Sequence, residues 1–156
     1  MINSKVFILV FFSLLVLNLK VLSKEDVFIS YKINDEIITN IDIKKEAQYL
    51  IALNNQLVNL KRNEILNVAK ESALREKLKK MELLKYFNFE NEDRGTDQYI
   101  KKIYSKLKLS NKVEFEEYLN KYELTVDYVE KKIRIEMYWN QLIYEKYKSQ
   151  VNIDII

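Results

Sequence analysis

The chain has 156 residues, with a single glycine and no proline, cysteine or histidine. The lack of Cys and His excludes disulfides, the usual zinc sites and Ser–His–Asp or Cys–His catalysis. One glycine excludes a phosphate-cradling loop and a dinucleotide fingerprint. We therefore expect no cofactor and no metal, and acid–base catalysis would have to rely on carboxylates alone.

An apolar run, "VFILVFFSLLVLNL", occupies residues 6–19 and is interrupted only by Ser13 and Asn18. A membrane span needs about 20 apolar residues, whereas a run of this length suits a secretory signal peptide cleaved after Ser23. Residues 1–23 are thus predicted to be a signal peptide, and residues 24–156 the mature domain. The alternative is an uncleaved N-terminal anchor, because Lys20 interrupts the run and the cleavage site lacks alanine.

The charge of the mature part is nearly balanced. Of the 26 basic residues, Lys5 and Lys20 lie in the leader, which leaves 24 basic against 23 acidic residues. The two signs are interleaved, as in "EKLKKMELLK" and "VEKKIRIEM", a pattern typical of solvent-exposed helix faces. Nucleic-acid binding needs a clustered basic face, so we expect no nucleic-acid partner.

The mature part begins with a predicted hairpin. "VFISYKI" at residues 27–33 alternates apolar and polar residues, which indicates a half-buried strand. Asn34 and Asp35 suit a two-residue turn, since both residue types tolerate the left-handed conformation. The return strand "EII" runs directly into a helix that Thr39 or Asn40 caps. The sequence therefore predicts a hairpin fixed against the start of the first helix.

The rest of the chain reads as helix. Helices are predicted at residues 41–58, 63–87, 97–108, from just after Asn111, and 126–149, with a polar loop at 88–97. The apolar stripe of the second helix includes Leu78 and Leu84. Asn111 with Glu114 forms a capping-box-like start, and Thr125 caps the last helix. The predicted fold class is mainly α, opened by a short β-hairpin.

The second half of the last helix, "MYWNQLIYEKY", is apolar or aromatic on more than one side. One helix face cannot bury all of these side chains. Either the helix is central and covered from several directions, or part of its surface is open to a partner. Tyr and Trp suit the second use, because they combine a large contact area with a polar tip. The candidate binding residues are Tyr138, Trp139, Leu142, Tyr144 and Tyr147.

Two segments resemble the SurA-type periplasmic chaperones. "INDEIITNIDI" at residues 33–43 is similar to the strand, turn and capped helix that open that family. "FEEYLNKYELTVDYVEKKIRIEM" at residues 115–137 is similar to its pair of helices, which ends in an "IR.EM"-like sequence. The resemblance covers residues 27–150 and implies the N-terminal peptide-binding domain, a multi-helix fold also related to part of trigger factor. No positions correspond to the family's parvulin-type prolyl isomerase modules, so no enzyme activity is expected.

The resemblance implies an ATP-independent periplasmic chaperone that binds unfolded polypeptides, with outer-membrane protein precursors as the expected clients. The five candidate residues of the last helix would then contact client segments weakly and at many places. One alternative is a membrane-anchored protein-interaction module without chaperone activity, held at the inner membrane and facing the periplasm. Another is a small enzyme that uses carboxylates alone.

The last six residues, "VNIDII", alternate as a strand does, with Val151, Ile153 and Ile155 on one side. A two-stranded hairpin alone is marginal in water and leaves both edges unpaired. Residues 151–155 are therefore predicted to pair with the hairpin of residues 27–38 as a third strand. The pairing could form within one chain or by exchange in a homodimer.

Overall fold

A two-stranded antiparallel hairpin, β1 (Ile29–Ile33) and β2 (Glu36–Thr39), comes first in a computed structural model that describes residues 26–88 and 95–149. Asn34 in its turn has a left-handed φ of 52°. Asn tolerates this conformation well, and the predicted two-residue turn is confirmed. The register pairs Ile33 with Glu36 across the turn and is irregular between Ile29 and Tyr31.

The hairpin runs into α2 (Asn40–Leu53) without a loop. Thr39 is the cap: its hydroxyl accepts from the Asp42 N–H at 3.2 Å, and the Asp42 carboxylate accepts from the Thr39 N–H at 2.8 Å. This reciprocal capping box satisfies two backbone donors that the helix itself leaves unpaired. The direction in which β2 enters α2 is therefore set by two residues three positions apart.

The first helix is shorter than the predicted range of 41–58. It ends at Leu53, because Asn54 is extended, with φ −141° and ψ 94°. The Asn54 side-chain oxygen accepts from the Gln56 N–H at 3.1 Å and caps a 3-10 turn, η1 (Asn55–Asn59). Asn side chains compete with the helical backbone in this way. Asn54 thus ends the helix.

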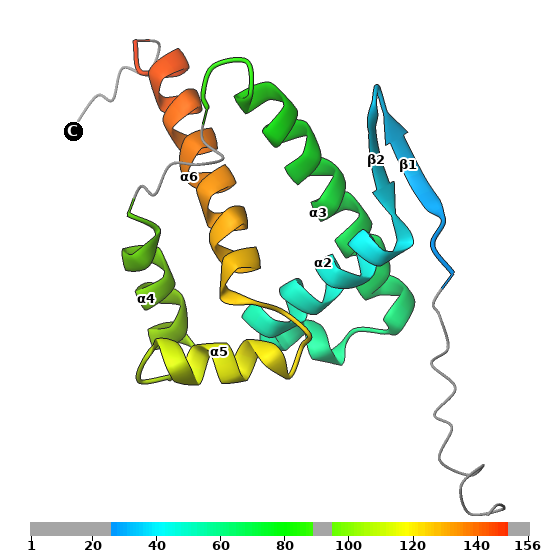
Figure 1. Cartoon of the computed structure of the whole chain (residues 1–156), viewed down its shortest axis with the longest axis vertical. Helices are drawn as coiled ribbons and strands as arrows, with labels where there is room; N and C mark the ends of the chain where they lie inside the picture. The colour runs from blue at the N-terminus through cyan, green and yellow to red at the C-terminus, as the bar shows by residue number, and fades with distance from the viewer. Residues whose placement is uncertain (1–25, 89–94, 150–156) are drawn as a thin grey trace, which may run out of the picture.

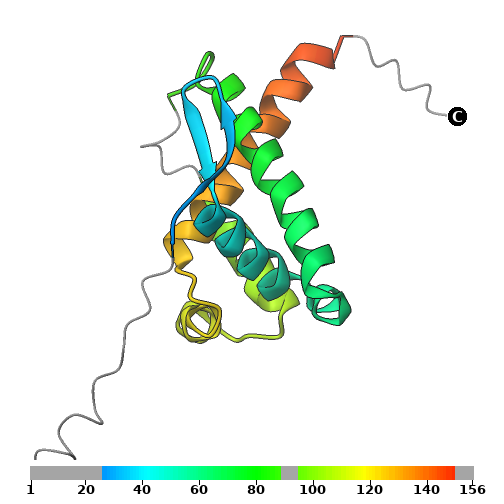
Figure 2. The same cartoon turned by 90° about the vertical axis from the view of Figure 1, so that its right-hand side faces the viewer.

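The remaining helices are α3 (Arg62–Leu83), α4 (Thr96–Lys106), α5 (Lys112–Asn120) and α6 (Val126–Tyr147). Their predicted caps are confirmed, since Asn111 and Thr125 accept backbone N–H groups in the first turns of α5 and α6. Figure 1 shows α3 and α6 rising toward the same end, with α2 crossing near their starts. The hairpin lies on one side of α3, and α4 and α5 lie beside α6 (Figures 1 and 2).

The described chain is therefore mainly α with a small sheet, and its buried apolar side chains form three separate clusters. A hairpin cluster joins the hairpin to α2 and α3, and contains Ile38, Ile43, Ala47 and Ala69. A larger cluster joins the end of α2 to α4, α5 and α6, and contains Ala52, Ile100, Phe115, Leu119, Leu124, Val129 and Ile133. A helix-end cluster joins α3 to α6, and contains Leu83, Ile135 and Tyr138.

Two expectations about burial were wrong. The alternation over residues 27–33 predicted that Val27 and Ile29 lie on the buried side of a half-buried strand, but Val27 precedes β1 and both residues are exposed, because β1 is the outer strand. Leu78 and Leu84 were assigned to the apolar stripe of the second helix, but they are exposed and Leu83 is fully buried. Since α6 packs against α3, the buried face at the end of α3 is turned toward α6.

The two chain ends carry predictions that the structure does not address. The leader, residues 1–23, and the proposed third strand, residues 151–155, lie outside the described residues. Within residues 26–88 and 95–149 the sheet has two strands. No helix in those ranges is both long and apolar enough to cross a membrane.

Candidate functional site

The five predicted residues of α6 fall into two groups. Tyr138 is 3 % exposed and belongs to the helix-end cluster, and its ring centroid lies 5.1 Å from that of Phe87. Trp139 and Leu142 are partly buried against the same cluster. These three side chains hold α6 against the end of α3, as the fully packed alternative requires.

The other two residues lie beyond this contact. Tyr144 is 68 % exposed and Tyr147 is 41 % exposed, on the last two turns of α6. Neighbouring Ile143 is 38 % exposed. The last two turns of α6 are thus open to solvent, as expected of a surface for a partner. The turns before them are packed, as expected of a helix covered by its neighbours.

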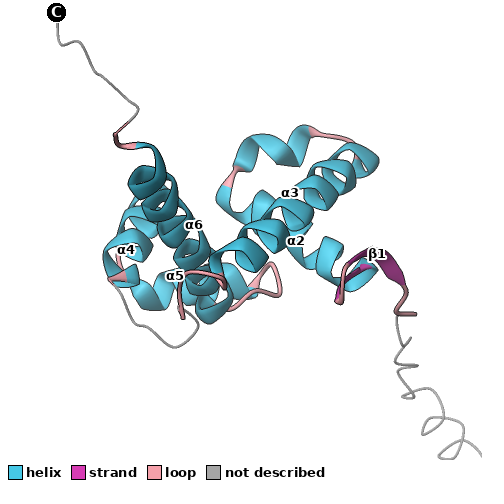
Figure 3. Ribbon diagram, turned by 90° about the horizontal axis from the view of Figure 1, so that it is seen from above, coloured by secondary structure: helices cyan, strands magenta, loops and turns pink. Residues whose placement is uncertain are grey.

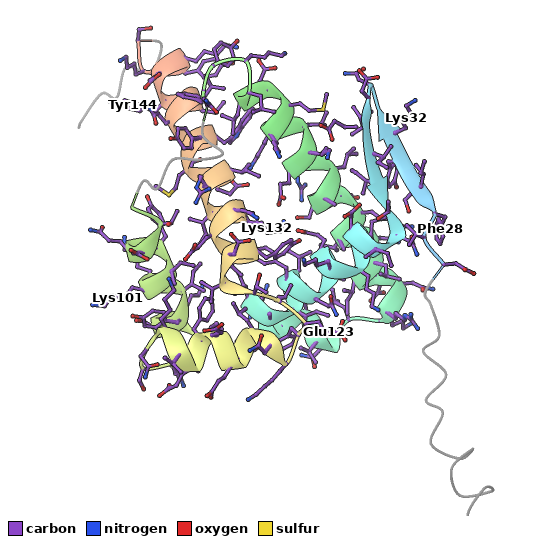
Figure 4. The ribbon with its side chains drawn as sticks, viewed as in Figure 1. Phe28, Lys32, Lys101, Glu123, Lys132 and Tyr144 are labelled. Carbon is purple, nitrogen blue, oxygen red and sulfur yellow. The ribbon has the colours of Figure 1, made fainter. Side chains whose placement is uncertain are left out.

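More apolar side chains are exposed where α3 ends. Leu84 and Tyr86, which follow α3, are both about half exposed. Figures 1 and 2 show that α3 and α6 end on the same side of the molecule, and Figure 4 places Tyr144 there. We call this set the helix-end surface, made of Leu84, Tyr86, Ile143, Tyr144 and Tyr147.

A second feature is a buried ion pair where α2, α3 and α6 meet. Lys132 of α6 and Glu46 of α2 are 4 % and 2 % exposed, and the Lys132 Nζ lies 2.5 Å from the Glu46 Oε2. Lys132 also forms a salt bridge with Glu76 of α3. One ammonium group therefore bridges two carboxyl groups from different helices. Figure 4 shows Lys132 directed into the space between α6, α2 and α3.

Polar and aromatic groups complete this cluster. The Ser72 hydroxyl donates to the Glu46 Oε1 at 2.7 Å, and the Tyr128 hydroxyl lies 3.4 Å from the Glu46 Oε2. The Lys132 Nζ lies 4.6 Å from the centre of the Tyr49 ring, within the range of a cation–π contact. Each oxygen of Glu46 thus has a partner, as a buried carboxylate requires.

Burial changes the acidity of the surrounding groups. It raises the pKa of Glu76 above its usual range, and the attraction of Lys132 offsets this effect only in part. Burial, with a further contribution from Glu46 and then Glu76, also raises the pKa of the Tyr49 and Tyr128 phenols. Both phenols are therefore protonated at neutral pH, and the Tyr128 hydroxyl can donate to Glu46.

Two cavities flank the cluster, with volumes of about 370 and 270 Å³. Glu46, Glu76 and Lys132 line both of them. The carboxylates therefore do converge on a hollow, which is the arrangement that the carboxylate-enzyme alternative requires. Both acids, however, are bound to Lys132, and Glu46 has no oxygen left for a substrate proton. The geometry favours a role in joining three helices.

Among the described residues, the carboxyl groups of Glu46 and Glu76 face a side-chain cation and not a metal site. Within residues 26–88 and 95–149, no group of three or more Asp or Glu side chains is placed to hold a metal ion. The cation that these carboxylates face is Lys132 itself.

The positions of Glu46 and Lys132 on the apolar stripes of their helices could have indicated this cluster, although the interleaved charges suggested exposed helix faces. Glu46 stands between Ile43 and Ala47 on the buried stripe of α2, and Lys132 lies next to Ile133 in the same way on α6. Charged residues at i+3 positions of an apolar stripe face the core. The expectation that these charges lie on solvent faces was therefore wrong for Glu46 and Lys132.

Comparison with known proteins adds no relative: no protein-family model, no curated protein and no solved structure matches this chain. Its function must be inferred from its own residues and geometry.

Proposed function

We propose that the chain is an ATP-independent periplasmic chaperone that binds unfolded polypeptides, with outer-membrane protein precursors as its main clients. In this proposal the fold is a SurA N-terminal-like, trigger-factor-related peptide-binding domain. Residues 1–23 are a cleaved signal peptide. The activity needs no catalytic group and no cofactor.

The observation that carries the proposal is the helix-end surface. Its five apolar or aromatic side chains are exposed on two helix ends that lie on the same side of the molecule. Exposed apolar side chains at one end of the molecule favour contact with other molecules. Tyr144 and Tyr147 suit extended clients of varied sequence, because a phenol ring offers apolar area and a hydroxyl together.

Weak binding is what a holding function needs. A ligand that binds the unfolded chain stabilises the unfolded state by mass action and opposes folding. A surface of a few half-exposed side chains contacts a client briefly, and release then needs no ATP. Three of the five residues first considered for contact, Tyr138, Trp139 and Leu142, would serve indirectly, by holding α6 in place.

The test is suppression of aggregation of an unfolded outer-membrane protein by the processed chain. We expect suppression by the intact chain and a clear loss in a Tyr144→Ala/Tyr147→Ala variant. Tyr99→Ala is the matched control, because Tyr99 is also about half exposed but lies on α4. Equal suppression by all three proteins would remove the helix-end surface from the proposal, and no suppression by the intact chain would end the chaperone proposal.

The second candidate function is a membrane-anchored interaction module without chaperone activity. The two proposals differ in the N-terminus of the protein isolated from the cell. A mass that corresponds to a start at Lys24 supports the soluble chaperone. Retention of residues 1–23 in the membrane fraction supports the anchored module.

A further inference from the structure

The hairpin leaves apolar side chains in solvent at a second place. Val27, Phe28 and Ile29 are 66 %, 61 % and 60 % exposed, and Tyr31 is 38 % exposed. These residues lie at the start of the described chain, on the far side of α3 from α6 (Figures 1 and 3). Exposed apolar side chains of this size favour contact with another molecule.

The outer edge of β1 offers backbone hydrogen-bonding groups. Ile33 and Glu36 close the two-residue turn, and antiparallel pairs alternate between hydrogen-bonded and non-hydrogen-bonded types. Lys32 is therefore in a non-hydrogen-bonded pair with Ile37, so its N–H and C=O point away from β2. Within the described residues no third strand pairs with β1. Such an edge is a template for another extended chain.

A groove of about 550 Å³ lies beside this edge, between β1, the start of α2 and the first half of α3. Its apolar lining comes from Phe28, Tyr31, Ile43 and Leu66. Among the residues that the structure describes, its charged lining is Lys44, Arg62 and Lys70, and none of its lining residues is acidic. Arg62 and Lys70 form no salt bridge with any residue that the structure describes.

We propose that β1 and this groove bind an extended peptide segment as a third strand, with apolar and acidic side chains alternating on the groove side. Alternate residues of an added strand point to the same face. Residues i, i+2 and i+4 would therefore enter the groove, the apolar ones against Phe28 and Tyr31 and an acidic one beside Arg62 and Lys70. Main-chain bonds supply affinity and the groove supplies the sequence preference, as in β-strand addition generally.

This inference rests on the proposed function and specifies one class of client segment. It differs from the helix-end surface in mechanism, because strand pairing requires an extended backbone with free amides, whereas contacts with exposed tyrosines do not. The positive lining also argues for acidic rather than basic segments, since opposite charges across an interface favour the matching partner and like charges reject the wrong one.

The experiment measures the fluorescence anisotropy of a labelled seven-residue peptide with alternating Val and Asp on one face, titrated with the processed chain. Two further peptides serve as comparisons: one with Lys in place of Asp, and one with N-methylated amides on the pairing edge. We expect the Asp peptide to bind, and both comparison peptides to bind roughly tenfold more weakly or not at all.

Variants locate the site. Lys32→Pro removes the outward N–H and leaves the bonds to β2 in place, and proline is tolerated on an edge strand. Arg62→Glu/Lys70→Glu reverses the charge of the groove. We expect both variants to weaken binding of the Asp peptide roughly tenfold, and the charge reversal to improve binding of the Lys peptide. Lys101→Glu/Lys102→Glu on the exposed face of α4 is the matched control and should change neither (Figure 4).

Each other outcome counts against the inference. Binding that is unchanged by both variants overturns it, and so does equal binding of the Asp and N-methylated peptides. Concentration-dependent self-association that Lys32→Pro abolishes would assign the edge to a second copy of the chain instead. If the chain suppresses aggregation but does not bind the peptide, the inference fails and the chaperone function stands. If both are absent, both fail.

Discussion

Lys132 and Glu46 form a salt bridge of 2.5 Å between α6 and α2, and both side chains are almost completely buried. Glu76 brings α3 to the same ammonium group. The hairpin cluster connects α2 with α3, and the helix-end cluster connects α3 with α6. The contact at Lys132 joins all three helices. A buried ion pair is weak support for stability, because desolvation opposes the attraction, but it penalises every arrangement that leaves one charge unpaired. Its role here is to fix how α6 sits against α2 and α3.

The first prediction concerns the loss of this shared cation. Lys132→Met should lower the free energy of unfolding by about 3–5 kcal/mol, because it leaves Glu46 buried without a counter-charge. The measurement is urea unfolding followed by circular dichroism. Lys131→Met is the matched control, since Lys131 is adjacent on α6 and its exposed pair with Asp127 contributes at most about 1 kcal/mol. Equal destabilisation by the two variants would contradict the role assigned to Lys132.

The second prediction concerns the pH dependence of stability. Burial raises the pKa of Glu76 in the folded chain above its usual value of 4.5. A carboxyl group of this kind stabilises the fold fully below its unfolded pKa, where it is protonated in both states. That contribution is lost as the pH rises through the raised folded pKa. The intact chain should therefore lose stability relative to a Glu76→Gln variant as the pH rises from 4.5.

The measurement is the difference in unfolding free energy between the two proteins at a series of pH values. The other titrating groups contribute equally to the unfolding free energies of the two proteins, so their contributions cancel in this difference. Glu71→Gln is the control, because Glu71 lies exposed on the same helix. A difference that moves in favour of the intact chain with rising pH would show that Lys132 lowers the pKa of Glu76 more than burial raises it.

Much of the local structure could be predicted from the sequence. The turn at Asn34 and the caps at Thr39, Asn111 and Thr125 depend on side chains and backbone groups within four residues of one another. Such short-range hydrogen bonds form wherever the residues occur. The helices therefore started where the sequence indicated, and the mainly α fold class followed from them.

The environment of particular side chains could not be predicted in the same way. Lys132 and Lys131 are neighbours of the same type, yet one is buried and the other exposed, because only Lys132 faces α2 and α3. Likewise, Leu83 rather than Leu84 is buried because α6 lies on that side of α3. These outcomes depend on which helix lies opposite, and that is a property of tertiary packing.

The third prediction separates the two groups of α6 residues. Tyr138→Ala should lower the free energy of unfolding by about 3–5 kcal/mol, because it removes a buried ring that packs on Leu83 and Phe87. Tyr144→Ala should change it by no more than about 0.5 kcal/mol, since the ring is mostly in solvent. Thermal unfolding of the two variants provides the comparison. A large loss of stability in Tyr144→Ala would remove this residue from the proposed client surface.

The fourth prediction concerns the end of α2. The Tyr118 hydroxyl of α5 donates to the Ala52 carbonyl at 2.7 Å. This carbonyl belongs to the last turn of α2, where carbonyls lack helical partners, and Ala52 is fully buried. Tyr118→Phe should therefore destabilise the chain by about 1–2 kcal/mol, the effect of leaving a buried acceptor unpaired. Tyr99→Phe, at an exposed site on α4, should have no measurable effect in the same unfolding assay.

The last prediction concerns the attachment of β1. Asn40 was considered as a cap, but it is the first residue of α2, and its side chain reaches back to the segment before β1. Its Oδ1 accepts from the Phe28 N–H at 2.9 Å, and its Nδ2 donates to the Asp26 carbonyl at 2.9 Å. The Asn40 N–H also donates to the Phe28 carbonyl at 3.1 Å. One residue thus holds the exposed Phe28 beside the groove.

Asn40→Ala removes the two side-chain bonds and keeps the backbone bond. We expect a loss of about 1–3 kcal/mol in unfolding free energy, from about 0.5–1.5 kcal/mol for each of the two bonds. The Phe28 amide should also exchange with solvent deuterium much faster than in the intact chain, because its acceptor is lost. Exchange at Ile33, next to the turn, should change little, since its pairing with Glu36 is untouched. Equal acceleration at Phe28 and Ile33 would mean that the whole hairpin opens as one unit, and that Asn40 anchors the strand rather than its first residues alone.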